Sequence, residues 1–198
     1  MLRLFIACSL ITVIAACHST HQQKRKLLVL GKGTVTVTDK NINVSGGSNA
    51  DQKEIEVPAE GKTTYNVTTP EGKSTIDISD SGYYILNLRP DTVVGSRRIE
   101  GRDYNNPNPI TLEQTKRNID SLQKLALGQN VSEANQNYFI TSGKLQRVTT
   151  HTDHVFVFGP YHPVFNQLEP GAEIYKFFSS KENRETIDHL IKVTKGED

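Results

Sequence analysis

Between residues 26 and 88, polar and apolar side chains alternate with a period of two. Successive side chains of a β-strand point to opposite faces, so this pattern predicts strands that each bury one face. Glycine-containing turn sequences separate the strands at short intervals, at 31–33, 46–48, 58–61, 70–72 and 80–82. The expected strands are 34–38, 41–45, 53–57, 63–68, 74–78 and 83–88. Six short strands of this kind predict a small antiparallel β-sandwich or open barrel.

The sequence after residue 110 carries two strong signals for helices. Thr111 with Gln114, and Ser179 with Glu182, each have the spacing of a capping box, in which side chain and backbone at a helix start bond reciprocally. Gly128 and Gly196 follow at positions where a glycine in the left-handed conformation ends a helix. The apolar faces are expected to consist of Leu112, Ile119, Leu122 and Ala126 in the first helix, and Ile187, Leu190, Ile191 and Thr194 in the second.

The same part of the chain also contains strand patterns. Segments 137–141 and 144–150 flank Ser142 and Gly143, which favours a hairpin, and 155–158 is apolar enough for a central strand. A further strand is expected at 172–178. Every phenylalanine except Phe5 lies at or beyond residue 139, which predicts the denser core in the C-terminal half.

Together these patterns predict an α+β fold. Its N-terminal β-rich domain, the antiparallel sandwich or open barrel, would span 26–89, and a smaller α+β part with two helices would span 111–198. Residues 90–110 contain several prolines and glycines and are interpreted as a connector.

The two cysteines of the chain, Cys8 and Cys17, both lie near its start. No intramolecular disulfide, thiolate metal site or cysteine nucleophile is therefore available in the body that follows. With 35% hydrophobic and 23% charged residues, the composition is that of a folded domain. Five of the 23 basic residues but none of the 22 acidic residues precede Asp39, so the body is slightly acidic, which argues against a nucleic-acid partner.

The first seventeen residues have the order of an export signal: Arg3, then an apolar run that ends in small residues. As a helix, residues 4–17 would extend about 21 Å, which is short of the roughly 30 Å hydrocarbon core of a bilayer. A removable signal therefore fits better than a membrane span.

The residues Ile14-Ala15-Ala16-Cys17 resemble the lipobox of bacterial lipoproteins. The resemblance implies a signal peptide over 1–16, acyl chains on Cys17, and a lipidated tether over 17–25 that holds the body on a membrane of the cell envelope. In the enterobacterial pattern an aspartate after the cysteine retains the protein at the inner membrane, and His18 stands there instead, so the outer membrane is expected. An uncleaved signal anchor and a plain secretory signal are the alternatives.

In the folded body the clustered histidines are His151 and His154, which flank Thr152 and Asp153. Imidazole binds metals and transfers protons near neutral pH, so these two histidines, with Asp153 or His162 as a third ligand, are the candidate metal site. On a straight strand the side chains of His151 and His154 would point to opposite faces, so joint metal ligation would need a turn at 150–153. The helical HExxH pattern of metalloproteases is missing, so isolated polar histidines are the simpler interpretation.

No nucleophile elbow or phosphate-binding loop occurs in the sequence. Five tyrosines could offer stacking surfaces for glycans, although tyrosines are also common as half-buried strand residues: Tyr83, Tyr84, Tyr104, Tyr138 and Tyr161. The sequence therefore favours a membrane-anchored envelope lipoprotein with a non-enzymatic interaction or assembly role and no cofactor. Its expected partners are the membrane and another envelope protein. The alternatives are a histidine-based metal-dependent hydrolase and a glycan- or ligand-binding module.

Overall fold

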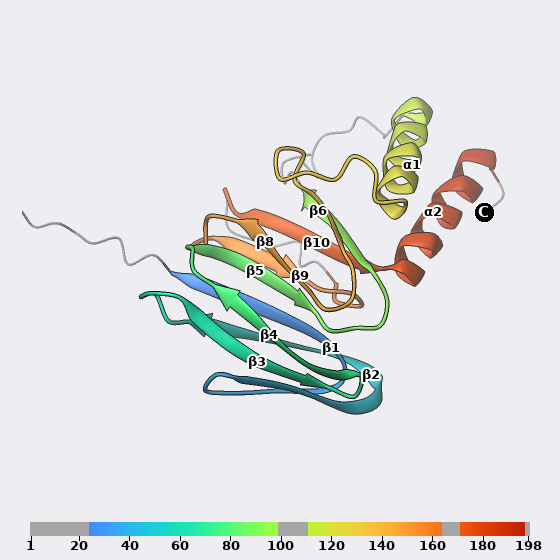
Figure 1. Cartoon of the computed structure of the whole chain (residues 1–198). Helices are drawn as coiled ribbons and strands as arrows, with labels where there is room; N and C mark the ends of the chain where they lie inside the picture. Colours follow the sequence, from blue (N-terminus) through green and yellow to red (C-terminus); the bar gives the residue numbers. More distant parts are fainter. Residues whose placement is uncertain (1–23, 99–110, 164–170, 197–198) are drawn as a thin grey trace, which may run out of the picture.

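The computed structural model describes residues 24–98, 111–163 and 171–196. The fold is α+β, and within the described residues ten strands form two sheets while two helices lie beside the second sheet (Figure 1). The elements are β1 (Arg25–Thr38), β2 (Asn41–Val57), β3 (Thr63–Thr69), β4 (Gly72–Ile78), β5 (Gly82–Asn87), β6 (Val93–Arg98), α1 (Leu112–Ala126), β7 (Asn137–Ile140), β8 (Lys144–Thr149), β9 (Val155–Phe158), β10 (Glu173–Ser179) and α2 (Ser180–Lys195).

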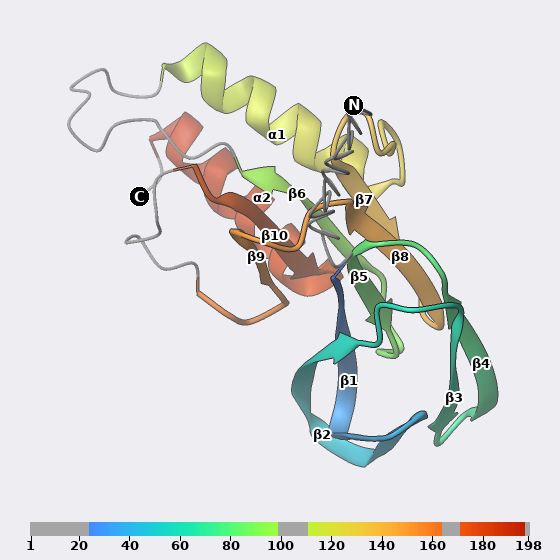
Figure 2. The same cartoon turned by 90° about the vertical axis from the view of Figure 1, so that its left-hand side faces the viewer.

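The first sheet has the strand order β4-β3-β2-β1-β5-β8 and curls into a nearly closed, barrel-like shape (Figure 2). The predicted antiparallel arrangement is wrong for two of its pairings, because β2 pairs with β3 and β1 with β5 in parallel. The remaining pairings in this sheet are antiparallel. Alternation shows which face of a strand is buried but not the direction of its neighbour, so the sequence pattern could not reveal this mixture.

One long bent hairpin, β1–β2, replaces three of the six predicted strands. The glycine segments 31–33 and 46–48 were expected to be turns, yet they lie inside the two strands. Lys32 pairs with Ala50 and Thr34 with Ser45, so the four residues 46–49 of β2 face Gly33 alone. Gly33 has a φ of 104°, and a Cβ there would lie 1.8 Å from the Ser45 carbonyl oxygen. These glycines therefore bend the hairpin at a bulge instead of ending its strands.

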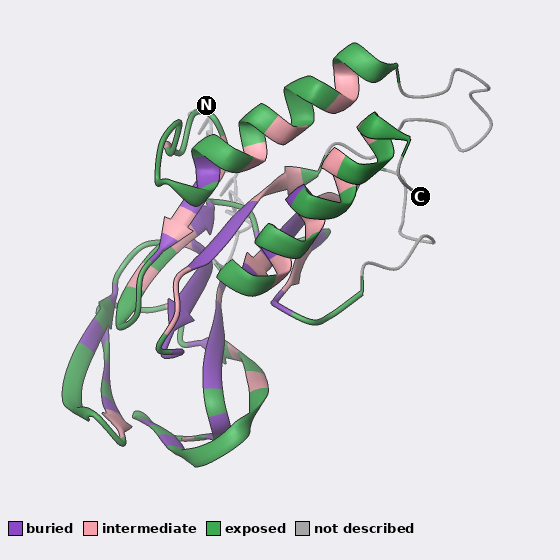
Figure 3. Cartoon of the chain, turned by 90° about the vertical axis from the view of Figure 1, so that its right-hand side faces the viewer, coloured by how far each residue is buried: buried purple, intermediate pink, exposed green. Residues whose placement is uncertain are grey.

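Residues 25–31 of β1 and all of β5 are buried on both faces and separate two clusters of core residues, seen as purple ribbon in Figure 3. The barrel interior consists of Leu27, Val29, Val35, Ile42, Val44, Val57, Tyr65, Val67, Ile76, Ile78, Tyr84, Leu86 and Leu88. The inter-sheet layer consists of Leu28, Leu30, Tyr83, Ile85, Val93, Tyr138, Ile140, Val148, Val155, Tyr175 and Phe177. Apart from Phe177, each described phenylalanine is only half-buried, so aromatic count alone did not locate the denser core.

The second sheet has the order β7-β6-β10-β9. Strand β6 lies within residues 90–110, so the connector prediction is wrong for 93–98. Strand β9 was expected to be central but is at the sheet edge. Strands β7 and β8 do not form the predicted hairpin, because β7 pairs with β6 and β8 with β5. The turn at Gly143, whose φ is 72°, carries the chain from one sheet to the other.

Both predicted capping boxes are confirmed, at Thr111 for α1 and at Ser179 for α2. Gly196 caps α2 with a φ of 70°, and Gly128 follows α1 with a φ of 69°. The predicted face of α2 is confirmed, whereas that of α1 is wrong at Leu112, which is 46% exposed, and at Ala126. The two helices pack on each other and on strands of the second sheet. No helix in the described part of the chain is long and apolar enough to cross a bilayer.

Candidate functional site

The histidines proposed as metal ligands are held by ordinary structural contacts. His151 Nδ1 lies 3.0 Å from Glu173 Oε1 at the edge of the second sheet. His162 contributes its backbone, because its carbonyl oxygen accepts a hydrogen bond from the Lys176 ammonium. His154 adopts a φ of 55° in the turn before β9. Among the residues that the structure describes, no three His, Cys, Asp or Glu side chains are grouped as metal ligands.

Glu173 is held as a structural carboxylate. Its Oε2 accepts hydrogen bonds from Tyr175 at 3.0 Å and Thr149 at 3.3 Å, and Arg97 approaches its Oε1 at 3.8 Å. Burial alone would raise the pKa of Glu173, but the hydrogen bonds from His151 and Tyr175 and the charge of Arg97 lower it overall. Because neighbouring side chains already use both oxygens, this carboxylate is poorly placed to serve as a base or a metal ligand.

Most tyrosines considered for glycan stacking are core residues. Tyr83, Tyr84 and Tyr138 are each at most 7% exposed, whereas Tyr161 is 51% exposed. Tyr104 lies outside the described residues, as does Cys17, the predicted lipidation site. Of these tyrosines, the structure therefore places only Tyr161 where a ligand could reach its ring.

A groove of about 700 Å³ opens beside Tyr161. Its walls come from three places: the bend of the β1–β2 hairpin, with Lys32 and 48–50; the connection between β5 and β6, with 89–91; and Lys181 in the first turn of α2. Lys32, Arg89 and Lys181 bring three positive charges to the groove and Asp91 brings one negative charge, so its walls carry a net charge of about +2.

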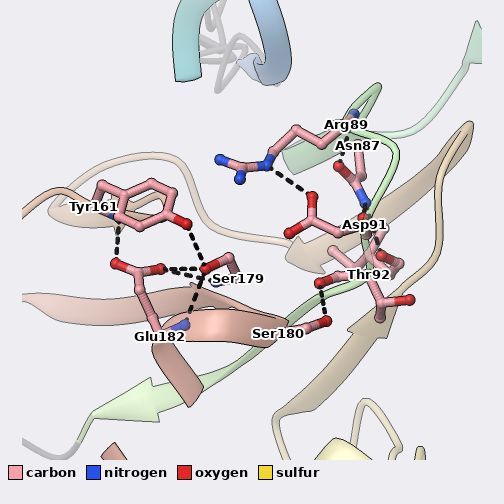
Figure 4. A network of polar contacts seen from close by, with 9 residues as sticks. Asn87, Arg89, Asp91, Thr92, Tyr161, Ser179, Ser180 and Glu182 are labelled. Carbon is pink, nitrogen blue, oxygen red and sulfur yellow. Dashed lines mark hydrogen bonds and ion pairs between the residues drawn. The ribbon is translucent and has the colours of Figure 1, made fainter. Parts of the chain in front are cut away.

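Arg89 is positioned by a buried asparagine. Asn87 is fully buried, and its Nδ2 donates to the carbonyl oxygens of Asp91 and Ile140, both at 2.9 Å. Its Oδ1 accepts from the Arg89 backbone amide at 3.1 Å. The Arg89 Nε then donates to Asp91 at 3.0 Å, and the guanidinium lies over the Tyr161 ring, 5.3 Å from the centroid (Figure 4). Asn87 thus fixes the turn that directs this arginine into the groove.

Tyr161 is held from two sides (Figure 4). Its backbone amide donates to the Glu182 carboxylate, and the Ser179 hydroxyl lies 3.2 Å from its own hydroxyl. Behind the loop, the buried Lys176 ammonium donates to the carbonyl oxygen of Gly159 at 3.0 Å. Burial lowers the pKa of Lys176, an effect that the charge of Glu182 partly opposes. The capping residues of α2 therefore also hold the aromatic wall of the groove.

No known family model, curated protein or solved structure matches the chain. What the groove can do must therefore follow from its own residues. Arg89 presents a guanidinium against an aromatic ring, and the surrounding cations favour an anionic ligand. What its walls offer a ligand is charge and shape.

Sequence reasoning missed Lys32, Arg89 and Lys181, although it named Tyr161. The three cations belong to different elements and come together only because the bent hairpin, the β5–β6 connection and α2 meet. No spacing in the sequence indicates this meeting. The one available signal was local: the segment Asn87 to Asp91 combines an amide, a guanidinium, a proline and a carboxylate, a mixture typical of a structured turn.

Proposed function

We propose that the protein is a lipid-anchored lipoprotein of the bacterial cell envelope whose folded body acts by binding, without catalysis. The sequence Ile14-Ala15-Ala16-Cys17 supports the anchor, because it combines an apolar run with the one cysteine outside that run's centre. Several acyl chains on Cys17 would provide stable membrane attachment, which one chain alone does not. With His18 after the cysteine, the proposed location is the outer membrane.

The position of β1 supports close attachment of the body to the bilayer. Only residues 18–24 separate Cys17 from the start of this strand at Arg25, a distance of at most about 29 Å when fully extended. The first seven residues of β1 are largely buried, so the proposed tether joins the lipid to a firmly packed segment. The end of the body that carries Lys24 and Asp153, which form an ion pair at 3.1 Å, would then face the membrane.

The proposed binding role rests on the groove beside Arg89. Lys32 lies seven residues beyond Arg25 along β1, or about 23 Å further from the anchored end. In Figure 1 the start of β1 is at the left of the molecule, whereas the β5–β6 connection and the start of α2 are at the right. A body anchored through β1 would therefore hold the groove away from its own bilayer, where it can meet a ligand or another envelope protein.

The anchor is tested by replacing the two cysteines separately. Cys17→Ala should abolish lipidation and leave an unprocessed or soluble chain, whereas Cys8→Ala, inside the apolar run, should be processed normally. Intact-mass measurement of the mature cellular protein should find residue 17 as its first residue, with acyl chains attached. A bare Cys17, or residues 1–16 retained in the mature protein, would refute the lipoprotein proposal.

The binding role is tested in intact cells with a photo-crosslinking amino acid at one of two exposed positions. Position 50 lines the groove, while Val193 lies in the last turn of α2 and is 44% exposed. The same cellular component should be captured from position 50 and not from position 193, and capture should decrease in a Lys181→Gln background. Equal capture from both positions, or none from position 50, would count against a binding role for the groove.

A further inference from the structure

We propose that the groove binds a phosphate group, either as the free ion or as a phosphomonoester, with Arg89 as its principal contact. The proposal rests on the binding role proposed above for the groove, and it is independent of the lipid on Cys17. Its basis is the arrangement of Arg89, Tyr161, Lys32 and Lys181 on separate elements around one opening.

Arg89 is buried yet keeps unused hydrogen-bond donors. Only 9% of the residue is exposed, and its Nε is engaged by Asp91. Neither of its two terminal nitrogens donates a hydrogen bond to any residue in the described ranges, and in Figure 4 the guanidinium extends away from Asn87 toward the side of Tyr161. The planar fork of a guanidinium fits two oxygens of one phosphate or carboxylate, and the groove gives a ligand access to it.

The guanidinium is also preorganised. Its contact with the Tyr161 ring, 5.3 Å from the centroid, restricts where the guanidinium can lie, and Tyr161 itself is held by Glu182 and by Ser179. Tyr161 adopts a φ of 64°, a left-handed conformation that is strained for a bulky residue and persists because these contacts oppose relaxation. A donor pair fixed before binding loses less entropy when the ligand arrives.

The charge of the groove favours a phosphate over a carboxylate. Lys32 and Lys181 add two ammonium groups from opposite walls, and the single acid, Asp91, is already paired with Arg89. The resulting net charge of about +2 matches a phosphomonoester, which carries about −1.5 to −2 at neutral pH, whereas a carboxylate would balance only half of it.

This chemistry has two sources in an envelope: free inorganic phosphate and a phosphorylated sugar of a surface glycan. Calorimetric titration of the mature chain in detergent micelles distinguishes them, with inorganic phosphate, glucose 1-phosphate, glucose and acetate as probes. Both phosphate compounds should bind, more weakly at high salt, while glucose should not bind and acetate should bind less tightly than either phosphate. Tighter binding of glucose 1-phosphate than of phosphate would assign the sugar source, and equal binding would assign the free ion. Failure of both to bind, or acetate binding as tightly as phosphate, would overturn the proposal.

Two variants locate the binding in the groove. Lys181→Gln should weaken phosphate binding roughly two- to fivefold, because one exposed charge is lost, whereas Lys192→Gln in the last turn of the same helix should leave binding unchanged. Arg89→Lys keeps the charge but loses the fork and should weaken binding about tenfold or more. Thermal unfolding of each variant is measured in parallel, because Arg89 also supports the β5–β6 turn.

Equal effects of Lys181→Gln and Lys192→Gln would exclude the groove as the phosphate site. Failure of this proposal can be separated from failure of the binding role. If neither phosphate compound binds but crosslinking from position 50 persists, the ligand class is wrong and the groove still binds a partner. If both fail, the groove has no binding role.

Discussion

The barrel interior and the inter-sheet layer lie on opposite faces of the same two strands, yet they are filled differently. Aliphatic side chains dominate the barrel interior, whose tyrosines are Tyr65 and Tyr84. The inter-sheet layer contains three tyrosines and Phe177, and the hydroxyls of these three donate to Glu54, Val148 and Glu173. Aliphatic packing requires only volume and alternation, whereas each buried hydroxyl also requires a partner in a fixed place. The bond from Tyr138 on β7 to Val148 on β8 joins the two sheets, so this layer helps to fix how the second sheet, and with it the groove, sits on the first.

The largest loss of unfolding free energy is expected when an aromatic ring is removed from the inter-sheet layer. Phe177 is fully buried, packs 5.8 Å from the Tyr138 ring between centroids, and lies directly over Gly95. Phe177→Ala should lower the free energy of unfolding by about 3–5 kcal/mol, measured by urea denaturation. Phe156→Ala, on the edge strand β9 where the ring is half-buried, should cost clearly less. Equal losses would mean that the inter-sheet layer is not a close-packed core.

The bend of the β1–β2 hairpin, and with it the curvature of the first sheet, depends on Gly33. An alanine there would meet the Ser45 carbonyl and would have to adopt a φ of 104°, so Gly33→Ala should cost about 2–3 kcal/mol. Gly46→Ala is the matched control within the same bulge, because a Cβ at Gly46 meets no atom within 4 Å. Its free energy of unfolding should change by less than about 1 kcal/mol. If the two variants unfold alike, the bend of the hairpin does not require a glycine at 33.

The same glycines show where sequence reasoning reached its limit. A Gly-Lys-Gly segment indicates a flexible backbone, but the sequence does not say whether the chain ends a strand there or bends it. The capping boxes at Thr111 and Ser179 were predictable because both partners lie three residues apart. Strand partners and the groove were not, since they depend on contacts between residues far apart in the sequence. Strands β7 and β8 illustrate this: a tight turn was correctly expected between them, but its strands join different sheets.

Alkaline pH tests the inter-sheet layer through the ionisation of its buried Tyr175. Burial raises the pKa of Tyr175 to about 12 from an ordinary value of 10.0, so this phenol stays neutral in the folded chain while it ionises in the unfolded chain. Its stabilising contribution is complete below pH 10 and is lost as the pH rises through 12, with a slope of about −1.4 kcal/mol per pH unit between these values.

Tyr175→Phe should make the pH dependence of the unfolding free energy shallower by about that amount. Measurements between pH 10.5 and 12 avoid the opposite effect of Lys176, whose pKa is lowered by burial and whose contribution rises with pH only up to the ordinary lysine value of 10.5. An unchanged slope in Tyr175→Phe would show that this phenol does not remain protonated in the folded protein.

The smallest predicted losses of unfolding free energy concern the N-cap residues of the two helices on the second sheet. Ser179 is fully buried and caps α2, whereas Thr111 caps α1 as an exposed residue. Ser179→Ala should cost about 1–2 kcal/mol and Thr111→Ala about 0.5–1 kcal/mol, because only the first leaves buried groups without a partner.

A double-mutant cycle then asks whether the Ser179 cap and the groove wall form one unit. The Ser179 hydroxyl contacts the Tyr161 hydroxyl at 3.2 Å, so Ser179→Ala and Tyr161→Phe should be non-additive, with a coupling free energy of about 0.5–1 kcal/mol in urea denaturation. Thr111→Ala with Tyr161→Phe should be additive, because no contact joins these two residues. Additivity in both cycles would separate the helix cap from the groove, and Tyr161 would then owe its position to Glu182 and the Lys176-bound loop alone.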